Sequence, residues 1–541
     1  MILIIGLDGA DWRILDPWLE DGSLPTLAAL KARGRWGDLT STIRPESSIA
    51  WTTFATGVNA GKHGIFGFVA QRPDDYGLAL NTAASIRAPS FWQYAAAAGR
   101  RIALLNIPMT YPPRAFPDGA VVAGMLTPDV RAPFTQPPEL RERLLAAVPD
   151  YVINVERTGM KLRDFIRATT RAIQARGRAA RWLLQQDDWD AMVAVFTATD
   201  RLQHYTLHLL HPDHPRHNPD EARRLLPELL AAYQAIDAAI ADLLNEAGPD
   251  PTVIILSDHG FSPVTRAFHI NAWLRDNGWL ALTAPPPAAQ PDLWQRLRQR
   301  PGLRRIKRSL PGLRDIRRPP AIAPWMTRID WSRTRAVYSP SGGVRFNISG
   351  REPQGIVDES NLDDLAAELI EALLAFDADS QFIADIYDRS ELYAGPMLAY
   401  APDLIIEPVR NDDMRFNAII RNNPTTAQTG DSGELTGNHA PQGILLALGP
   451  GVKPVDWGPA PVDAIPATIA SARLQDLAPT ILHLLGLPIP AGMDGRVLDF
   501  VTGDITRAGA SDAAPSPGTS ADLSHEDQDI IQERLRSLGY L

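Results

Sequence analysis

Two short apolar runs in the sequence are followed closely by residues able to bind a metal ion. Asp8 follows the run at 2–6, and the adjacent pair Asp258 and His259 follows the run at 252–256. Carboxylate oxygens and imidazole nitrogens are ligands that suit zinc and neighbouring divalent ions. If both runs are strands of one α/β sheet, these side chains emerge at its carboxyl edge, where such sheets bind ligands. Each of them is also compatible with a simple turn.

A third apolar run, at 191–197, leads into Asp200 and His204. A spacing of four residues places both side chains on one face of a helix. The alternative is that Asp200 caps its helix while His204 is exposed. Four more histidines follow, but their wider spread and the prolines between them favour a surface stretch, so we leave them out of the candidate set: His208, His211, His214 and His217.

A candidate nucleophile lies in the segment 44–57, which reads Arg-Pro-Glu-Ser-Ser-Ile-Ala-Trp-Thr-Thr-Phe-Ala-Thr-Gly. A hydroxyl of Ser47 or Ser48 would lie near the start of a helix. Free backbone N–H groups and the positive end of the helix dipole favour a phosphate anion there. Serine is equally common as a plain helix cap, and the chemistry of the residues alone leaves both readings open.

The composition narrows the classes of function. The 541 residues include no cysteine, which excludes thiolate ligands and cysteine nucleophiles and leaves metal binding to histidines and carboxylates. The net charge of −10 gives no general basic footprint for nucleic acid. The chain enters an apolar strand-like run at once, without a targeting segment, and has no apolar stretch of about 18 residues. We therefore expect a cytoplasmic protein without a transmembrane segment.

The residues with possible chemistry need a scaffold, and the apolar runs indicate which one. Short apolar runs alternate with helical patterns at 221–244 and 477–485. This alternation predicts an α/β fold with a doubly wound, mainly parallel sheet sandwiched by helices. The runs expected to form its strands are 2–6, 101–106, 191–197, 252–256 and 443–448.

The chain divides into one large domain and a tail. We expect a catalytic domain at 1–503, with inserted, cap-like regions near 99–151 and 283–400 where prolines break the pattern. An Ala/Ser/Pro/Gly-rich stretch predicts a flexible linker at 504–524. The amphipathic pattern at 525–541 predicts a helix that docks on its own domain or on a partner.

The segment 296–318 is strongly basic, with ten Lys or Arg residues and the single acid Asp315. One hypothesis is a lip that attracts anionic substrates or lipid headgroups. A solvated helical face is the reading we favour, because most charge runs only face solvent. Peripheral membrane contact is therefore the less favoured expectation.

Taken as an ordered set, the motifs resemble the alkaline phosphatase superfamily, and most closely its type I phosphodiesterase and nucleotide pyrophosphatase branch. The resemblance covers the chain from residue 1 to about 500. Its motifs are Gly-Leu-Asp-Gly at 6–9, Ser47 through Thr56-Gly57, Lys-His-Gly-Ile at 62–65, Asp200 with His204, Ser-Asp-His-Gly at 257–260, and Gly-Asn-His at 437–439.

The resemblance implies two metal sites of three ligands each. One ion is held by Asp200, His204 and His439; the other is held by Asp8, Asp258 and His259, with Ser47 bridging toward it. The ions implied are two divalent metals, zinc first and manganese second. In this branch the nucleophile precedes Thr-Gly by nine positions and Gly-Ile by seventeen, intervals that select Ser47 over Ser48. The implied reaction is phosphoester hydrolysis through a phosphoseryl intermediate.

Two positions depart from the family pattern. Nucleotide pyrophosphatases carry an asparagine shortly after Gly-Ile, and this chain has Phe68 there. Related bacterial proteins have a proline two positions after the nucleophile, and this chain has Ile49. Lys62 is a weak candidate for substrate contact, with an exposed loop lysine as the favoured alternative. We therefore expect a phosphodiesterase acting on a small phosphate ester of unknown identity, in an oligomeric state that we leave open.

Other functions use related residues. A phosphomonoesterase or phosphonate hydrolase on the same site is the first alternative. Sulfatases need a Cys/Ser-x-Pro-x-Arg context, which the segment after Ser47 lacks. Cofactor-independent phosphoglycerate mutases place the last histidine soon after the Asp-His pair, whereas His439 lies far from His259. A third class is a non-catalytic binding protein that uses 296–318.

Overall fold

The computed structural model describes residues 1–72, 75–283, 326–409, 414–416, 435–455, 466–509 and 523–537. The basic segment 296–318 lies outside the described residues. So do 510–522 of the predicted linker and 538–541 of the predicted terminal helix.

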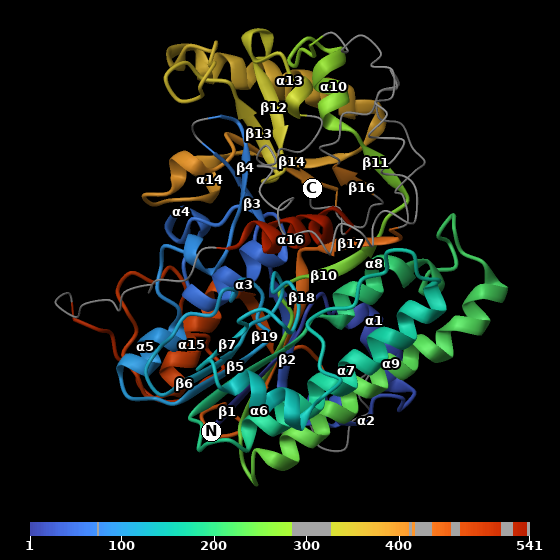
Figure 1. Ribbon diagram of the computed structural model, residues 1–541, viewed down its shortest axis with the longest axis vertical. Helices are drawn as coiled ribbons and strands as arrows, with labels where there is room; N and C mark the ends of the chain where they lie inside the picture. The colour runs from blue at the N-terminus through green and yellow to red at the C-terminus, as the bar shows by residue number, and fades with distance from the viewer. Residues whose placement is uncertain are drawn as a thin grey trace, which may run out of the picture.

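A nine-stranded sheet runs through the main body, in the order β19-β2-β18-β9-β1-β8-β5-β6-β7 (Figure 1). The central strands β9, β1, β8, β5 and β6 are parallel, whereas β18 and β7 run against their neighbours. The predicted mainly parallel sheet is confirmed. Its strands are β1 (Ile2–Leu7), β2 (Arg35–Thr40), β5 (Ile102–Leu105), β6 (Gly119–Val122), β7 (Thr135–Gln136), β8 (Ala191–Phe196), β9 (Thr252–Leu256), β18 (Gln442–Leu448) and β19 (Ile469–Arg473).

Helices cover both faces of this sheet because its central strands are apolar on both sides (Figure 1). Successive β1 residues point to opposite faces: Leu3 and Ile5 join one core cluster, and Ile2 and Ile4 join the other. The first face is covered by α1 (Trp12–Glu20), α2 (Pro25–Arg33), α6 (Leu140–Ala147), α7 (Leu162–Leu184), α8 (Ala198–Leu210) and α9 (Pro219–Glu246). The second face is covered by α3 (Ser47–Thr56), α5 (Phe91–Ala97) and α15 (Leu477–Leu484).

Both helices predicted from the sequence form, with ends set by local chemistry. The helix expected at 221–244 is α9, which begins with Pro219 and is capped by the Asn218 side chain accepting from two backbone N–H groups. The helix expected at 477–485 is α15, and Gly486 follows it with a positive φ of 72°. Glycine adopts that left-handed conformation without strain, so it ends the helix.

A smaller antiparallel sheet lies beyond the main body, in the order β12-β13-β15-β14 (Figure 1). It packs with α10 (Ile270–Asp276) and α13 (Leu362–Ser380) around a separate apolar cluster. Its strands are β12 (Ala336–Ser339), β13 (Gly343–Phe346), β14 (Ile383–Asp388) and β15 (Leu404–Pro408).

Short elements connect the two sheets. The ribbon of β10 (Gly260–Pro263) and β17 (Gly437–Ala440) is antiparallel, and β11 (Arg266–Phe268) pairs with β16 (Met414–Phe416). The remaining elements are α4 (Ala60–His63), β3 (Val69–Gln71), β4 (Leu78–Leu80), α14 (Arg389–Leu392), α16 (His525–Ser537) and the 3-10 turns η1 (Ala83–Ser85), η3 (Met326–Arg328), η4 (Trp331–Arg333), η5 (Glu359–Asn361), η6 (Leu398–Tyr400) and η8 (Leu474–Asp476).

The segment 99–151 differs from the expected insertion. It supplies β5, β6 and β7, which form one edge of the main sheet. Its prolines lie in the connections that follow β5, β6 and β7 and in the turn after α6, outside the strands themselves. Because β6 and β7 have only four and two residues, their periodicity was too short to reveal them.

The terminal helix α16 docks on the main domain. Ile531 and Leu535 are buried in the main core cluster. Arg534 donates to the carbonyl oxygens of Thr127 at 2.7 Å and Pro128 at 2.8 Å, and it pairs with Glu156. The chain thus returns to its own domain after residues 510–522.

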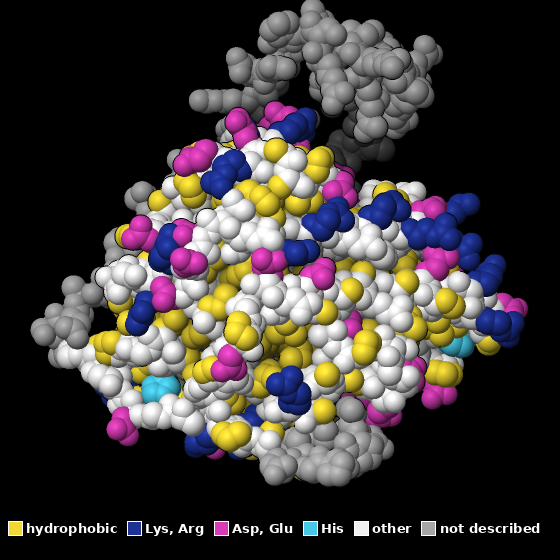
Figure 2. Space-filling model, turned by 90° about the horizontal axis from the view of Figure 1, so that it is seen from below, with side chains coloured by type: hydrophobic (Ala, Val, Ile, Leu, Met, Phe, Trp, Pro, Cys, Tyr) yellow, Lys and Arg dark blue, Asp and Glu magenta, His cyan; other side chains and the backbone are white. Residues whose placement is uncertain are grey.

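The described surface mixes charges of both signs. On the face in Figure 2, Lys and Arg side chains are interspersed with Asp and Glu side chains. Among the described helices, none combines the length and the apolar character that crossing a membrane requires.

Candidate metal centre

Three neighbouring strands deliver the candidate ligands to one edge of the main sheet. Asp8 directly follows β1, and Asp258 and His259 follow β9, which pairs with β1 in parallel register. Asp200 lies in the first turn of α8, which follows β8 on the other side of β1. All four residues are buried, with at most 4% of the surface of each residue exposed.

The β10–β17 ribbon brings the last ligand to this edge. Gly260 begins β10 directly after His259, and His439 on β17 pairs with Phe261 in the ribbon. The long stretch of sequence between His259 and His439 contains the smaller sheet. The antiparallel pairing of β17 with β10 therefore brings His439 back beside His259.

Three ligand atoms form a compact triangle. Asp200 Oδ1 lies 3.3 Å from His204 Nε2 and 3.1 Å from His439 Nε2, and the two nitrogens are 3.2 Å apart. Ligands about 2.05 Å from a tetrahedral zinc ion are about 3.3 Å from one another. The spacing of the three atoms therefore fits one face of a zinc coordination sphere.

The hydrogen bonds of the two imidazoles show what these atoms can do. His204 Nδ1 lies 3.0 Å from the Gly437 carbonyl, and His439 Nδ1 lies 2.7 Å from the Pro45 carbonyl. Because a carbonyl oxygen only accepts, each Nδ1 carries the hydrogen, and a neutral imidazole then has a lone pair on Nε2. The lone pairs of both Nε2 atoms and the Asp200 carboxylate oxygen thus point to one position. A cation bound there would stabilise this arrangement of three acceptors.

A second cluster of acceptors lies beside the first. His259 Nε2 is 3.2 Å from Asp258 Oδ2 and 3.8 Å from Asp8 Oδ1, while its Nδ1 faces the Gly260 carbonyl at 3.1 Å. Among the described residues, none donates a hydrogen bond to the buried Asp8 Oδ1. One oxygen of each carboxylate is oriented by a donor: Gly9 N donates to Asp258 Oδ1 at 3.1 Å, and Trp51 Nε1 donates to Asp8 Oδ2 at 3.0 Å.

The two clusters adjoin each other. Ligand atoms of Asp8, Asp258 and His259 lie within 4.8 Å of one another, and so do those of Asp200, His259 and His439. His259 therefore stands between the two groups, and the donor chemistry fits two neighbouring divalent ions.

Burial shifts the pKa values of the ligand side chains in both clusters. Burial, together with the charges of Asp258 and Asp200, raises the pKa of Asp8 well above its usual range. Burial raises the pKa of Asp258 to about 8 and lowers the pKa of His259 to about 4. Burial also acts to raise the pKa of Asp200, but the contacts with His204 and His439 outweigh it and lower that pKa well below its usual range.

Ser47 and Ser48 point to different partners. Ser47 is the first residue of α3, and its Oγ lies 3.2 Å from His259 Nε2. Ser48 Oγ instead donates to Glu46 Oε1 at 2.7 Å. Ser47 is therefore the hydroxyl that the structure brings to the ligand atoms, at the N-terminal end of a ten-residue helix.

The Lys62 side chain contacts residues other than the candidate ligands. It belongs to the short helix α4 rather than to a loop, and its ammonium group contacts the Asp494 carboxylate and the Gly492 carbonyl. The neighbouring His63 is buried, and its Nδ1 accepts from the backbone of Ile65, so its Nε2 donates to Thr53 at 3.0 Å. Lys62 and His63 of this motif thus both contact other parts of the protein.

Trp51 is the residue of the site that we did not identify from the sequence. Its indole N–H orients Asp8, and its ring is fully buried. Trp51 lies four positions after Ser47, so both side chains lie on one side of α3. This spacing is the one sequence signal that pointed toward the role of Trp51.

The expected surface stretch of histidines is wrong for two of its members. His208 and His214 are buried. His208 Nδ1 lies 3.1 Å from Thr436 Oγ1, and His214 Nε2 faces the Val264 carbonyl at 3.1 Å. Both therefore contact residues next to the β10–β17 ribbon: Thr436 directly precedes β17, and Val264 directly follows β10.

Comparison with known proteins gives the chain a family and a fold. A family model described as type I phosphodiesterase / nucleotide pyrophosphatase matches residues 2–433. Phosphonoacetate hydrolase from Sinorhizobium meliloti 1021, solved with phosphonoformate, has a TM-score of 0.51 at 15% identity, covering 90% of this chain and 95% of that one. This similarity shows a shared fold.

Two further solved structures cover 93% of this chain and all of their own. Murine ectonucleotide pyrophosphatase / phosphodiesterase 5 has a TM-score of 0.48 at 13% identity, and the human protein has 0.49 at 14%. No curated protein matches the chain.

Proposed function

The chain belongs to the type I phosphodiesterase / nucleotide pyrophosphatase family and is a phosphoric ester hydrolase, and on this premise we propose that it hydrolyses phosphodiesters with two divalent metal ions and Ser47 as nucleophile. Zinc is the metal that the donor set suits best, with manganese second. The substrate is a small phosphate ester. The cytoplasmic location and the solvated face at 296–318 stay predictions.

One observation carries the proposal: the triangle formed by Asp200 Oδ1, His204 Nε2 and His439 Nε2, in which backbone carbonyls fix both imidazole tautomers. These residues would hold one ion. Asp8, Asp258 and His259 would hold the other, beside Ser47. Two bound ions supply charge neutralisation at the attacking and departing oxygens of an in-line displacement at phosphorus.

Ser47 and its helix provide the remaining parts of the reaction. In the proposed reaction Ser47 Oγ attacks phosphorus, a bond from Oγ to phosphorus forms, and the bond to the leaving oxygen breaks. Water then hydrolyses the phosphoserine ester and restores the hydroxyl. The N-terminal end of α3, with its free N–H groups and positive dipole, stabilises the non-bridging phosphate oxygens.

Phe68 argues against a nucleotide as the main substrate. Its side chain is buried in the main core, and its backbone N–H donates to Glu46 Oε1 at 3.1 Å. The amide that nucleotide pyrophosphatases place at this position is thus replaced by an apolar ring packed away from solvent. Phosphomonoesters and phosphonates are the alternative substrate classes on the same site.

A direct assay compares bis-p-nitrophenyl phosphate with p-nitrophenyl phosphate, using the full-length protein loaded with zinc or manganese. We expect faster turnover of the diester. Ser47→Ala is expected to lower kcat by at least about a thousandfold. Ser48→Ala is the matched control, since it removes the adjacent hydroxyl, which faces Glu46, and should leave kcat within about threefold.

Two outcomes would contradict this proposal. Unchanged turnover in Ser47→Ala would exclude Ser47 as the nucleophile. Metal binding without turnover of any phosphate, sulfate or phosphonate ester would favour the non-catalytic binding protein instead.

A further inference from the structure

An ion pair outside both proposed ligand sets lies at the end of the loop after β1. Asp11 ends this loop three residues after Asp8, and it is the N-cap of α1. It is buried, with 4% of its surface exposed. Its partner Arg13 lies in the first turn of α1, and 57% of the arginine side chain is exposed. These two residues form the Asp11–Arg13 pair.

The two side chains meet through two parallel hydrogen bonds. Asp11 Oδ1 accepts from Arg13 Nε at 3.0 Å, and Asp11 Oδ2 accepts from Arg13 Nη2 at 2.7 Å. Asp11 Oδ1 also accepts from the backbone N–H of Arg13 at 2.9 Å, which is the usual hydrogen bond of an N-cap. A bidentate contact fixes the plane of the guanidinium as well as its distance. The direction of the Arg13 N–H groups is therefore set by Asp11.

The Asp11–Arg13 pair also binds the outer edge of β10. Asp11 Oδ2 accepts from the Phe261 backbone N–H at 3.3 Å, and Arg13 Nη2 donates to the Phe261 carbonyl at 3.0 Å. An acceptor and a donor side by side are what a neighbouring strand would offer to this residue. Within the ranges that the structure describes, β10 pairs with β17 alone. The pair thus takes the place of a second neighbouring strand.

This contact explains how Phe261 faces its partner in the ribbon. The N–H and C=O groups of one strand residue point to the same side, and those of Phe261 both point to the Asp11–Arg13 pair. Phe261 and His439 are therefore a non-hydrogen-bonded pair, the kind in which opposite side chains lie closest. The Phe261 ring accordingly contacts the rings of His204 and His439. The position of β10 thus affects both imidazoles of the metal-ligand triangle.

The same loop contacts the residues that precede Phe261. Ser257 Oγ donates to the Ala10 carbonyl at 2.7 Å. Gly260 lies so close to Asp11 that an added Cβ would be 2.6 Å from Asp11 Oδ2. Glycine leaves room for this approach because it has no side chain. The loop after β1 therefore binds the segment 257–261 on both sides of His259.

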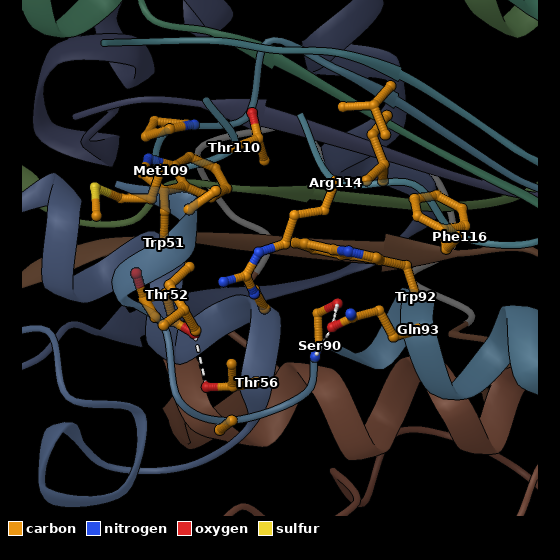
Figure 3. A pocket seen from close by; sticks show the side chains of 17 residues that line it. Trp51, Thr52, Thr56, Ser90, Trp92, Gln93, Met109, Thr110, Arg114 and Phe116 are labelled. Carbon is orange, nitrogen blue, oxygen red and sulfur yellow. Dashed lines mark hydrogen bonds between the residues drawn. The ribbon is translucent and has the colours of Figure 1, made fainter. Parts of the chain in front are cut away.

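Trp51 holds the candidate metal centre from the other face of the main sheet. Its indole N–H donates to Asp8 Oδ2 at 3.0 Å. Its ring lines a pocket formed by residues of α3 and α5, and Trp92 lies on the other side of this pocket (Figure 3). Trp51 belongs to the core cluster of that face, whereas Trp12, between the two residues of the pair, belongs to the cluster of the first face. Trp51 thus orients one ligand, and the Asp11–Arg13 pair holds the ribbon.

We propose that Asp11 and Arg13 are positioning residues of the metal centre. The pair fixes the Phe261 backbone, and through β10 it sets His259, which precedes the strand, and His439, which pairs with it. This inference rests on the proposed function, since it takes both histidines as zinc ligands. Asp11 and Arg13 act through the ribbon and are not ligands themselves. Their loss should therefore weaken zinc binding more than it weakens the metal-free fold.

Asp11→Ser separates this role from helix capping. Serine is an N-cap comparable to aspartate, but its shorter side chain has a single oxygen and cannot pair with Arg13 and bind Phe261 as well. We expect zinc affinity, measured by competition with a chromogenic chelator, to fall by about tenfold. The melting temperature of the zinc-free protein should stay within about 4 °C of the wild type.

Two arginine variants and a matched control extend the test. Arg13→Gln removes the donor to the Phe261 carbonyl and should also lower zinc affinity by about tenfold. Because Arg13 is largely exposed, this variant should fold even if Asp11→Ser folds poorly. Arg13→Lys should recover part of the affinity, since lysine keeps the charge but lacks the fork of donors. Arg223→Gln is the control, because Arg223 is exposed and pairs with Asp220 near the start of α9.

Two further readouts distinguish positioning from a general loss of structure. With cobalt in place of zinc, the visible absorption spectrum reports the geometry of the ligands, and it should change in Asp11→Ser and Arg13→Gln but not in Arg223→Gln. In EDTA, hydrogen exchange of the Phe261 amide, followed by mass spectrometry of a peptide that contains it, should be faster in Asp11→Ser than in the wild type. This second measurement tests the contact without metal.

The outcomes separate this inference from the proposed function. The inference is overturned if Asp11→Ser or Arg13→Gln folds and binds zinc like the wild type, or if exchange of the Phe261 amide is unchanged in Asp11→Ser. A wild-type protein that binds zinc but hydrolyses no phosphate ester would contradict the proposed function and leave the comparison of zinc affinities valid. A wild-type protein that binds no zinc would contradict both.

Discussion

The imidazole of His439 stacks on the imidazole of His259, with ring centroids 3.8 Å apart and 23° between the ring planes. The two residues are distant in the sequence, and the β10–β17 ribbon holds them together. Each ring directs Nε2 toward a different carboxylate: His439 toward Asp200, and His259 toward Asp258. The geometry of both proposed metal sites therefore depends on this ribbon.

Phe261 tests the role of the ribbon. It pairs with His439 and also makes edge contacts with the rings of His204 and His439, at centroid distances of 4.9 and 5.4 Å. We expect Phe261→Leu to weaken zinc binding by about tenfold, because the two imidazoles lose a packing surface that orients them. Competition with a chromogenic chelator measures this, and Phe91→Leu, at a fully buried position on the other face of the sheet, is the control. Equal zinc affinities in the two variants would contradict the role of Phe261.

Trp51 is expected to act on Asp8. Its hydrogen bond to Asp8 Oδ2 favours the ionised carboxylate, so Trp51→Phe raises the pKa of Asp8 further. We predict that zinc binding at neutral pH weakens by about tenfold, in the range seen when partners of metal ligands are removed. Trp92→Phe, a ring on the far side of the pocket, serves as the control and should keep the affinity of the wild type. An unchanged affinity in Trp51→Phe would show that the N–H group does not orient Asp8.

The zinc affinities of the two proposed sites should depend differently on pH. Asp258 has a pKa of about 8 without metal, so a proton competes with the ion below that pH. Zinc affinity at the Asp8, Asp258 and His259 site should fall by up to about tenfold for each pH unit from 8 to 6. The pKa of Asp200 is lowered, so the other site should change much less over this range. Variants that retain one site each, His439→Ala and Asp258→Ala, separate the two slopes in chelator competition.

The metal-free protein should gain stability from Asp258→Asn. A carboxyl whose pKa rises from 3.8 when unfolded to about 8 when folded binds more protons in the folded state, so its contribution to stability falls between these pH values. At pH 9 in EDTA we expect the free energy of unfolding to increase by roughly 2–4 kcal/mol in Asp258→Asn. Denaturant unfolding measures this, and zinc should reverse the order of the two proteins. A metal-free variant less stable than the wild type would contradict the burial cost assigned to Asp258.

The predictable part of the site follows from local chemistry. Asp8 follows β1 directly, and Asp258 and His259 follow β9 after one residue. Parallel pairing places the ends of these strands at one edge, so the convergence of the three side chains could be predicted. Asp200 and His204 are one helical turn apart, which also needs no tertiary information. His439 could be placed only through the resemblance, because the chain crosses the smaller sheet before the ribbon returns it.

Other features depend on contacts between distant segments. Ser47 and Ser48 have the same chemistry, and only Glu46 and His259 distinguish them in space. The burial of His208 depends on Thr436, which lies on the far side of the smaller sheet in the sequence. In the same way, β7 of the main sheet has two residues and becomes visible only through its pairing with β6. Sequence periodicity does not contain this information.

The count of bound zinc ions tests the central claim most directly. Elemental analysis of the full-length protein, after zinc loading and removal of free metal, should give two zinc ions per chain. His439→Ala should lower the count to one, because Asp8, Asp258 and His259 remain in place. A count of zero or one in the wild type, or of two in His439→Ala, would contradict the two-site account.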